Sequence, residues 1–233
     1  VSVSEYFQKY LELKRKENFI DFDDIIQLAI RFLAEDANYA EARHWKFKDL
    51  FVDEFQDVNP LQFALLQAWL GSSSSLTVVG DPCQAIYSWN GADARFLNDF
   101  EKYFPNSQTV ILKDNFRSSP EILALSSSIL PMMEHLDSKK QSGRLPTIRA
   151  ELDEYEEARS VARLVKELAV GDIDLGDQAV LVRTHAQIPP IIEVFKEREI
   201  KFMVATDAES GAGRDDGVQI LTLHAAKGLE WKI

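Results

Sequence analysis

The sequence contains almost no cysteine and no long apolar run. Cys83 is the single cysteine among 233 residues, so no disulfide can form within the chain and a reducing compartment is expected. No apolar stretch approaches the ~20 residues of a membrane-spanning helix, so we expect no membrane association. An initiator Met, a signal peptide and a transit signature are also missing, and we therefore expect a fragment of a longer protein.

Positive charge is scarce as well. Lys and Arg number 26 against 38 Asp and Glu, a net charge of −12, whereas proteins that bind phosphate backbones usually present a basic face. The excess lies in two blocks: residues 21–57 hold 10 acidic and 4 basic residues, and residues 151–177 hold 9 and 3. The remainder is neutral, so the charge does not exclude DNA but predicts little broad electrostatic attraction to it. A composition of 45% hydrophobic and 27% charged residues is that of a globular protein.

Short apolar segments alternate with amphipathic ones along the chain. Short apolar strands are expected at 50–52, 76–80, 109–113, 179–183, 201–205 and 218–223, and those at 50–52, 76–80 and 179–183 are expected to be buried. Helices are expected at 22–34, 61–70, 92–103, 121–130, from 153 to 168, and after Pro189-Pro190. This alternation is typical of α/β proteins with parallel strands. The remaining expectations are an irregular region at 131–147, a Gly-rich linker at 206–217 and a domain boundary at 104–108.

Helical spacing also predicts which helix faces are packed. In the helix expected at 22–34, the packed stripe would consist of Ile25, Leu28, Ala29 and Phe32. In the helix that begins near 153, it would consist of Tyr155, Ala158, Val161, Ala162, Val165 and Leu168.

Two adjacent carboxylates, Asp53 and Glu54, come directly after the strand expected at 50–52, within the segment Asp-Glu-Phe-Gln-Asp. Ligands of parallel α/β sheets bind at the carboxyl ends of strands. Two carboxylates at such a place can divide the work, one holding Mg²⁺ and the other activating water for attack on a phosphate. For the pentapeptide alone, a solvated acidic loop is an equally good interpretation.

A second polar segment, Gly-Asp-Pro-Cys-Gln-Ala-Ile-Tyr-Ser-Trp-Asn-Gly-Ala, begins at Gly80 and follows the second expected strand. Gly80 and Pro82 predict a tight turn, and the amide of Gln84 can sense a phosphate or its attacking water. Tyr87 and Trp89 alternate, as a stacking platform for single-stranded bases requires. Packing of both aromatic rings in a core is at least as good an interpretation.

Two further polar segments also lie beside expected strands. Leu-Lys-Asp-Asn-Phe-Arg-Ser-Ser-Pro, from Leu112 onwards, contains Arg117, which is either an ordinary surface residue or an arginine finger that stabilises charge on a phosphoryl group. Its end, Ser-Ser-Pro followed by Glu121, is typical of a helix start. Thr-Leu-His-Ala-Ala-Lys-Gly-Leu-Glu-Trp, from Thr222 onwards, contains His224, and a lone histidine is more often structural than functional.

In this order and spacing, the four segments closely resemble motifs II, III, IV and V of superfamily 1A helicases of the UvrD/Rep/PcrA type. The stretch Ile-Asp-Phe-Asp-Asp-Ile at 20–25 is similar to the element that precedes motif II in that family. The resemblance covers roughly residues 19–130 and 218–233. It implies an α/β fold of the P-loop NTPase helicase type, with RecA-like parallel sheets flanked by helices in two incomplete lobes. The implied domains are the C-terminal part of lobe 1A at 1–105 and lobe 2A at 106–233.

The resemblance also implies residue roles in an ATP-dependent DNA helicase or translocase that uses ATP and Mg²⁺. Asp53 would be the metal ligand, Glu54 would orient the attacking water, and Gln84 would sense the γ-phosphate. Arg117 would reach the γ-phosphate as an arginine finger, and Glu230 would bind the nucleotide ribose. The residues implied in DNA contact, or in coupling it to hydrolysis, are Tyr87, Trp89, Asn115, Thr222, His224 and Gly228.

The same resemblance implies a biological setting. The family moves 3′ to 5′ on single-stranded or 3′-tailed duplex DNA, which implies work in repair, replication or recombination beside other proteins of those processes. A bacterial, cytoplasmic and nucleoid-associated protein is implied. Two alternatives from other classes stay open: a metal-dependent nuclease that uses Asp53, Glu54 and Asp57, and a non-catalytic interaction module derived from a helicase.

Four departures from the family pattern bear on activity. The sequence has no Gly-Lys pair, so the phosphate-binding motif I is missing, and it stops at Ile233 before the arginine-bearing motif VI. We therefore expect these 233 residues to be inactive on their own. Asn90 occupies a place where many relatives have Arg, which puts one charged contact in doubt. The interval from Arg117 to Thr222 is too short for the 2B subdomain that relatives commonly insert, so we expect this subdomain to be absent.

Overall fold

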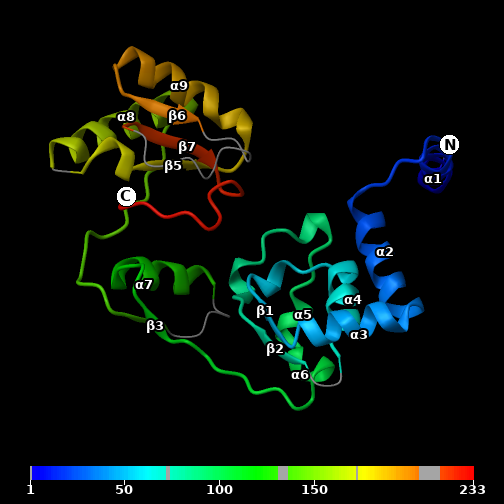
Figure 1. Cartoon of the computed structure of the whole chain (residues 1–233). Helices are drawn as coiled ribbons and strands as arrows, with labels where there is room; N and C mark the ends of the chain where they lie inside the picture. The colour runs from blue at the N-terminus through cyan, green and yellow to red at the C-terminus, as the bar shows by residue number, and fades with distance from the viewer. Residues whose placement is uncertain (1, 72–73, 131–135, 172, 205–215) are drawn as a thin grey trace. The chain divides into compact units, whose positions relative to one another are not determined.

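The computed structural model describes residues 2–71, 74–130, 136–171, 173–204 and 216–233. The chain divides into two compact units, Val1–Leu145 and Pro146–Ile233, each of which has its own core (Figure 1). This division falls later than the boundary expected at 104–108, and the assignment of 106–145 to the second lobe stays a prediction. None of the helices in the described ranges is long and apolar enough to cross a membrane.

The first unit begins with three helices, α1 (Val3–Glu17), α2 (Phe22–Glu35) and α3 (Ala37–Lys46). The pattern did not predict α1 or α3, whereas α2 lies where it was expected. A capping box fixes its start, because the Asp21 and Asp24 carboxylates each accept the other's backbone N–H at 2.9 Å. The Lys14 ammonium lies 2.6 Å from an oxygen of each of these carboxylates and ties α1 to α2.

The packed stripe of α2 was predicted correctly in part. Leu28 and Ala29 are half-buried, as expected. Ile25 and Phe32 are exposed, however, and Leu33 is the residue of this helix that is buried. Helix α2 packs against α3 and α4, so helical spacing identified the element and part of the side on which its neighbours lie.

A small parallel sheet and the helix between its strands form the centre of the first unit. Strands β1 (Asp49–Val52) and β2 (Ser75–Val78) pair in register from Asp49 with Ser75 to Val52 with Val78, and α4 (Pro60–Trp69) connects them (Figure 1). Pro60 occupies the first turn of α4, as expected. The buried side chains of the core are Phe55, Phe63, Leu66 and Phe96, and the Phe63 and Phe96 rings stack with centroids 4.2 Å apart.

The strands of this sheet are half exposed rather than buried. Leu50 and Val52 pack against the core, whereas Phe51 points away from it and is 78% exposed. Alternate residues of a strand point to opposite faces, and within the described residues only one face of this sheet carries a packed core. The expectation of a continuously buried strand at 50–52 was therefore wrong.

Two expected elements beyond the sheet differ in the structure. The helix predicted at 92–103 is divided into α5 (Arg95–Asn98) and α6 (Phe100–Tyr103), because Asp99 between them has a non-helical backbone. The strand predicted at 109–113 was wrong: Val110, Ile111 and Leu112 are exposed, and no strand of the described residues pairs with them. The pairing lies just beyond, where β3 (Asp114–Asn115) runs parallel to β4 (Asp137–Ser138).

Helix α7 (Pro120–Ile129) follows β3 and begins where the Ser-Ser-Pro-Glu signal predicted a helix start. Residues 131–135, in the region expected to be irregular, lie outside the described residues. Most of the linker expected at 206–217 lies outside them too, as does the last residue of the strand expected at 201–205.

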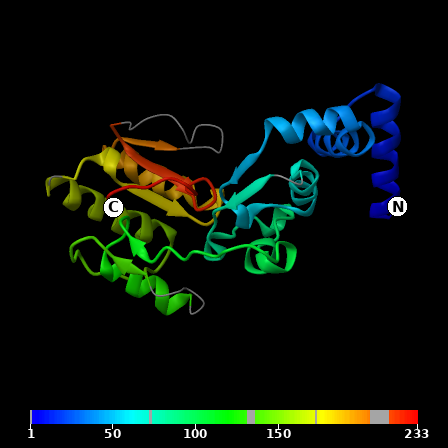
Figure 2. The ribbon, with the colours of Figure 1, turned by 60° about the horizontal axis from the view of Figure 1, so that its bottom comes forward.

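The second unit is a three-stranded parallel sheet covered by helices. Its strands lie in the order β5-β7-β6, and Figure 2 shows them side by side. The chain order is α8 (Glu154–Val170), β5 (Ala179–Val182), α9 (Ile188–Glu197), β6 (Phe202–Val204) and β7 (Val218–Thr222). Each of these five helices and strands lies where the sequence predicted an element of that type. Helix α9 begins one residue before the Pro189-Pro190 pair that predicted it.

Both faces of this sheet are packed. Helices α8 and α9 cover one face, where Ala162, Val194, Phe195, Val218 and Ile220 form the core. Leu221 packs on the opposite face with Ala225 and the nearby Leu229 and Trp231, so the segment after β7 folds back over the sheet. The chain end continues this cover, because Ala179 donates its backbone N–H to the carbonyl of Ile233 at 3.0 Å. The segment expected to carry motif V is therefore part of the core of its unit.

Candidate functional site

The carboxylate pair lies at the carboxyl end of β1, as the sequence predicted. Asp53 follows the last residue of the strand, and both Asp53 and Glu54 are exposed. Glu54 has φ +52° and ψ +39°, a left-handed backbone that is uncommon for residues other than glycine. Its N–H is bound by Asp53 Oδ1 at 2.8 Å, and its carbonyl accepts the N–H of Asp57 at 2.9 Å. Such strained positions recur at functional sites because the surrounding contacts hold them in place.

A buried glutamine joins this pair to the loop that follows β2. Gln56 lies in the 3₁₀ turn η1 (Phe55–Asp57). Its amide nitrogen donates to Glu54 Oε2 at 2.5 Å, and its amide oxygen accepts the backbone N–H of Asp81 at 3.0 Å. Below this contact, the Phe55 N–H donates to the carbonyl of Val79 at 2.9 Å. The two loops expected to carry motifs II and III are therefore one hydrogen-bonded structure.

Asp81 organises the next turn, η2 (Pro82–Gln84). One carboxylate oxygen accepts the N–H of Cys83 at 2.9 Å, and the other accepts the side-chain amide of Gln84 at 2.9 Å. Burial, and to a smaller extent the negative charge of Asp81, raise the pKa of the Cys83 thiol above its ordinary value of 9.0. Gln84 is thus held on the loop that is joined to Glu54, and its side chain is exposed.

Tyr87 and Trp89 form an aromatic pair beside this loop. Their ring centroids are 6.3 Å apart with an angle of 60° between the planes. Tyr87 is half-buried, whereas Trp89, in η3 (Ser88–Asn90), is 72% exposed. The interpretation that both rings pack in a core was therefore wrong for Trp89. A large apolar ring held on the surface by a neighbouring ring is suited to stacking on a flat ligand.

Asn115 and Arg117 lie in the loop that leads to α7. The side-chain oxygen of Asn115 accepts the backbone N–H groups of Arg117, at 3.1 Å, and of Ser118, at 2.8 Å. Arg117 is exposed, and Asn115 is half-buried. The structure therefore assigns Asn115 a local role: it shapes the turn that presents the Arg117 side chain.

The remaining predicted residues follow β7 in the second unit. Thr222 is buried, and its hydroxyl accepts the N–H of Ala225 at 3.2 Å. The His224 Nδ1 lies 3.3 Å from the guanidinium of Arg183, and Gly228 has φ +81°, which an L side chain adopts only with strain. Glu230 is exposed. The Thr222 side chain is thus turned inwards and holds the turn after β7, whereas His224, Gly228 and Glu230 are at or near the surface.

The structure thus connects five of the predicted residues through the loops of the first unit: Asp53, Glu54, Gln84, Tyr87 and Trp89. Arg117 and Asn115 belong to another loop of that unit. Within the described residues there is no group of three or more His, Cys, Asp or Glu side chains placed to hold a metal ion.

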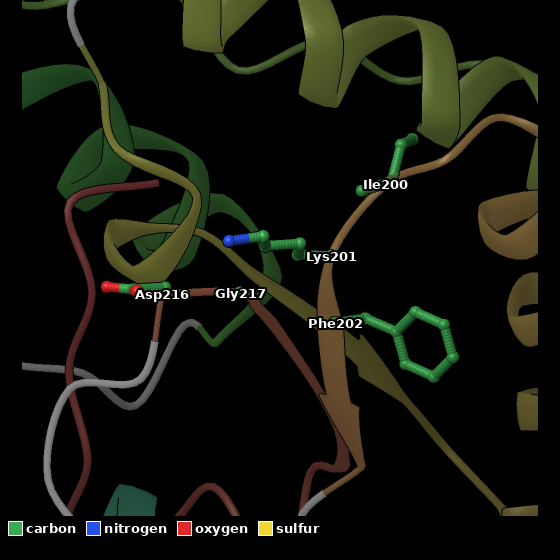
Figure 3. A pocket seen from close by; sticks show the side chains of 5 residues that line it. All are labelled: Ile200, Lys201, Phe202, Asp216 and Gly217. Atoms are coloured by element: carbon green, nitrogen blue, oxygen red, sulfur yellow. The ribbon is translucent and has the colours of Figure 1, made fainter.

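An open hollow of about 430 Å³ lies in the second unit, between the start of β6 and the start of β7. It is lined by Ile200, Lys201, Phe202, Asp216 and Gly217. Figure 3 shows the side chains of Lys201 and Phe202 directed to opposite sides of the strand. None of these five lining residues is among those predicted to bind nucleotide or DNA.

Sequence reasoning missed the contact between Gln56 and Asp81 and the space that Gly80 provides for it. Gln56 and Asp81 are within the quoted segments, but no pattern in the sequence indicates that they contact each other across two loops. The tight turn expected after Gly80 is present as η2. Gly80 also provides space, because an added Cβ would lie 2.6 Å from Gln56 Oε1. The only signals for this packing are a Gln between a Phe and an Asp and a Gly directly after an apolar run.

Comparison with protein families matches nearly the whole chain to two helicase domains. Residues 2–105 match the UvrD/REP helicase N-terminal domain, and residues 110–210 match the UvrD-like helicase C-terminal domain. Among curated relatives, the ATP-dependent DNA helicase UvrD2 of Mycobacterium tuberculosis H37Rv is 32% identical over 222 residues, which is 91% of this chain and 31% of the relative.

Two further relatives give the same result. The ATP-dependent DNA helicase UvrD1 of the same organism is 31% identical over 87% of this chain and 28% of the relative. The ATP-dependent DNA helicase Rep of Buchnera aphidicola subsp. Baizongia pistaciae is 31% identical over 85% of this chain and 30% of the relative. The matched region therefore spans about three-tenths of the length of these relatives.

Proposed function

Because the chain belongs to the UvrD/Rep family of helicases, we propose that it supplies part of the ATP and DNA sites of an ATP-dependent DNA helicase or translocase. One observation carries this proposal above the others. The Asp53-Glu54 pair lies at the carboxyl end of a parallel strand and is joined through Gln56 to the loop of Asp81 and Gln84. That loop continues to the exposed ring of Trp89. The groups that would act on a phosphate and the ring that would stack on a base therefore lie on connected loops of the first unit.

The donor chemistry of the pair fits MgATP. Mg²⁺ is commonly held by one or two protein carboxylates together with substrate phosphates and water, and Asp53 presents one exposed carboxylate at the end of β1. When bound there, the metal would neutralise charge on the phosphates. Glu54 would accept a proton from the attacking water, and Gln84 would sense the γ-phosphate. We assign Arg117 to charge stabilisation at the γ-phosphate and Glu230 to the nucleotide ribose.

For DNA, we propose that single-stranded bases stack on Trp89, with Tyr87 supporting its ring. Stacking tolerates any base, because every base has a flat π-face. His224 and Gly228 would contact the strand. Asn115 and Thr222 would act by holding the turns in which they lie, since the side-chain oxygen of each accepts backbone N–H from that turn.

The wider setting is part of the same proposal. Residues 1–105 would belong to the RecA-like lobe 1A and residues 106–233 to lobe 2A, without a 2B insertion. Movement would run 3′ to 5′ on single-stranded or 3′-tailed DNA, in repair, replication or recombination in a bacterial cytoplasm. The 233 residues alone would not hydrolyse ATP, since no Gly-Lys pair is present to cradle the phosphates.

Substitution of Glu54 tests the proposal. In the complete gene product, we expect Glu54→Gln to slow single-turnover ATP hydrolysis by roughly 10²- to 10⁴-fold while ATP still binds, because a general base contributes about that factor. Quenched-flow hydrolysis and equilibrium binding of a fluorescent ATP analogue measure the two quantities. Glu41→Gln, which changes an exposed residue of α3, is the matched control. Single-turnover hydrolysis at the wild-type rate in Glu54→Gln would remove Glu54 from this role.

A further inference from the structure

Gln56 is a fully buried polar side chain for which the motif resemblance implies no role. Its exposed fraction is 0%, and both ends of its amide are hydrogen-bonded. The amide nitrogen lies 2.5 Å from Glu54 Oε2, and the amide oxygen lies 3.0 Å from the backbone nitrogen of Asp81. One planar group therefore joins the loop that follows β1 to the loop that follows β2.

The two partners together require an amide at this position. A carboxylate such as that of Glu54 accepts hydrogen bonds, and a backbone N–H donates them, so the joining side chain must donate at one end and accept at the other. The same two partners define which end of the Gln56 amide is nitrogen and which is oxygen. A Glu side chain would keep an acceptor for Asp81 but bring a second negative charge to Glu54. A Met side chain would lose both hydrogen bonds.

The surroundings leave the amide little room to move by itself. A Cβ at Gly80 would lie 2.6 Å from Gln56 Oε1 and 3.2 Å from the backbone nitrogen of Phe55. Backbone bonds from Phe55 to Val79, at 2.9 Å, and from Val79 to Val52, at 2.8 Å, close the two loops on each other. A shift of the Asp81 backbone would therefore strain its hydrogen bond to the Gln56 amide, and the same amide is bound to the carboxylate of Glu54.

The connection continues from Asp81 towards the aromatic pair. The Asp81 carboxylate holds the side-chain amide of Gln84 at 2.9 Å, and Tyr87 follows three residues later. We propose that Gln56 is a positioning residue that couples this loop to Glu54, so that DNA bound at the aromatic pair sets the orientation of the Glu54 carboxylate and hence the rate of ATP hydrolysis. The inference rests on the proposed function, in which Glu54 activates water and the aromatic pair binds DNA.

A purely structural role for Gln56 makes a different prediction. If Gln56 only filled the core beneath the loops, its loss would lower stability but leave the ratio of DNA-stimulated to basal hydrolysis unchanged. Gln178 offers a matched control, since it is a buried glutamine of the second unit that donates to the carbonyl of Ile173 at 3.2 Å. Gln178→Met should lower the melting temperature and keep the wild-type ratio.

The first measurement is amide hydrogen exchange in the 233-residue chain, followed by NMR. We expect Gln56→Met to speed exchange of the Asp81 N–H roughly tenfold, because its acceptor is lost. In Gln56→Glu the acceptor remains, so the rate should stay within about twofold of wild type. This readout requires neither ATP nor DNA, and it separates the Asp81 end of the connection from the Glu54 end.

The second measurement is ATP hydrolysis by the complete gene product with and without single-stranded DNA. Both Gln56→Met and Gln56→Glu should lower the stimulation ratio roughly ten- to a hundredfold, because each breaks the charge-assisted bond to Glu54. If Gln56→Met proves too unstable to purify, Gln56→Glu provides the same test.

The outcomes distinguish the coupling role of Gln56 from the proposed function on which it rests. A reduced ratio in the Gln56 variants, with the wild-type ratio in Gln178→Met, supports the coupling role. A wild-type ratio in both Gln56 variants overturns the coupling role and leaves the proposed function in place. If the wild-type protein shows no stimulation by DNA, the proposed function fails and the inference fails with it.

Discussion

Gly80 is the residue at which the packing of the site is tightest. Its Cα faces the Gln56 amide oxygen and a methyl group of Leu97, and an added Cβ would lie 2.9 Å from that methyl carbon. Contacts this short force a neighbour to shift. Because Gly80 has no side chain, the loop that follows β1 and the loop that follows β2 can meet. The exposed carboxylate of Glu54 is bound by the Gln56 amide, which lies in this closely packed contact.

At the same scale, Trp89 is the residue most directly tied to DNA binding. We expect Trp89→Ala in the complete gene product to weaken single-stranded DNA binding by ~1–3 kcal/mol, the value of one base stacked on an aromatic ring. Fluorescence anisotropy of a labelled oligonucleotide measures the change. Trp45→Ala is a close control, because Trp45 is 74% exposed and lies on α3, outside the motif segments. Equal affinities for Trp89→Ala and wild type would exclude the stacking role.

At the scale of elements, the start of α7 is held by a contact with a distant segment. The Glu121 carboxylate accepts hydrogen bonds from the Ser142 hydroxyl and, at 3.0 Å, from the Gly143 N–H. The hydroxyl of Ser142 and then the N–H of Gly143 are the main causes that lower the pKa of Glu121 from 4.5 to about 2. This contact lies four residues beyond Arg117, so it steadies the helix onto which the Arg117 loop leads.

The lowered pKa of Glu121 gives a prediction with a definite sign. A carboxyl group whose pKa is lower in the folded state than in the unfolded state stabilises the folded state. This stabilisation is complete at pH values above the pKa of the unfolded state, and it is lost as the pH falls through the pKa of the folded state. We expect the attachment of 142–143 to α7 to weaken as pH falls from about 4.5 to about 2. The chemical shift of the Gly143 amide, followed by NMR over this range, measures it.

Glu121→Gln is the matched variant for this titration, because it keeps an acceptor but does not ionise. Its Gly143 amide should show no corresponding transition. A transition of wild-type size in Glu121→Gln would assign the effect to another group.

Strand prediction succeeded or failed according to what surrounds each apolar segment. Residues 218–222 form β7 between β5 and β6, with the α8–α9 core on one face and Leu229 and Trp231 on the other. Residues 109–113 are just as apolar but have no pairing strand among the described residues. Apolar runs reveal a tendency to be buried, whereas a strand also needs a neighbour whose backbone can complete the ladder.

In the molecule as a whole, the net negative charge comes from two stretches of sequence, one in the first unit that ends near the carboxylate pair and one in the second unit that includes α8. The block at 21–57 covers α2, α3, β1 and Glu54, and the block at 151–177 covers α8 and its flanks. The rest of the chain is neutral. DNA binding by the chain would therefore rest on stacking more than on attraction between phosphates and a basic surface.

Salt dependence tests this expectation for the whole chain. Each phosphate neutralised by a basic residue steepens the loss of affinity with salt, and six to ten such contacts cost roughly 10³- to 10⁵-fold between about 50 and 200 mM. We expect the affinity of the 233-residue chain for single-stranded DNA to fall less than about tenfold over that range. Anisotropy titrations at several salt concentrations measure the slope. A loss of a thousandfold would show that phosphate contacts dominate.

The amino-acid sequence was enough to predict the family, the order of the helices and strands in the second unit, and the placement of Asp53 and Glu54 after a strand. These properties are local: residue types, their spacing and their periodicity contain them. The tertiary structure decided that α2 packs through Leu33 rather than Phe32, that Trp89 is exposed, and that 109–113 is not a strand. It also decided that Gln56 joins Glu54 to Asp81. These features depend on which segments distant in sequence become neighbours in space, and the spacing of residues along one segment does not contain that information.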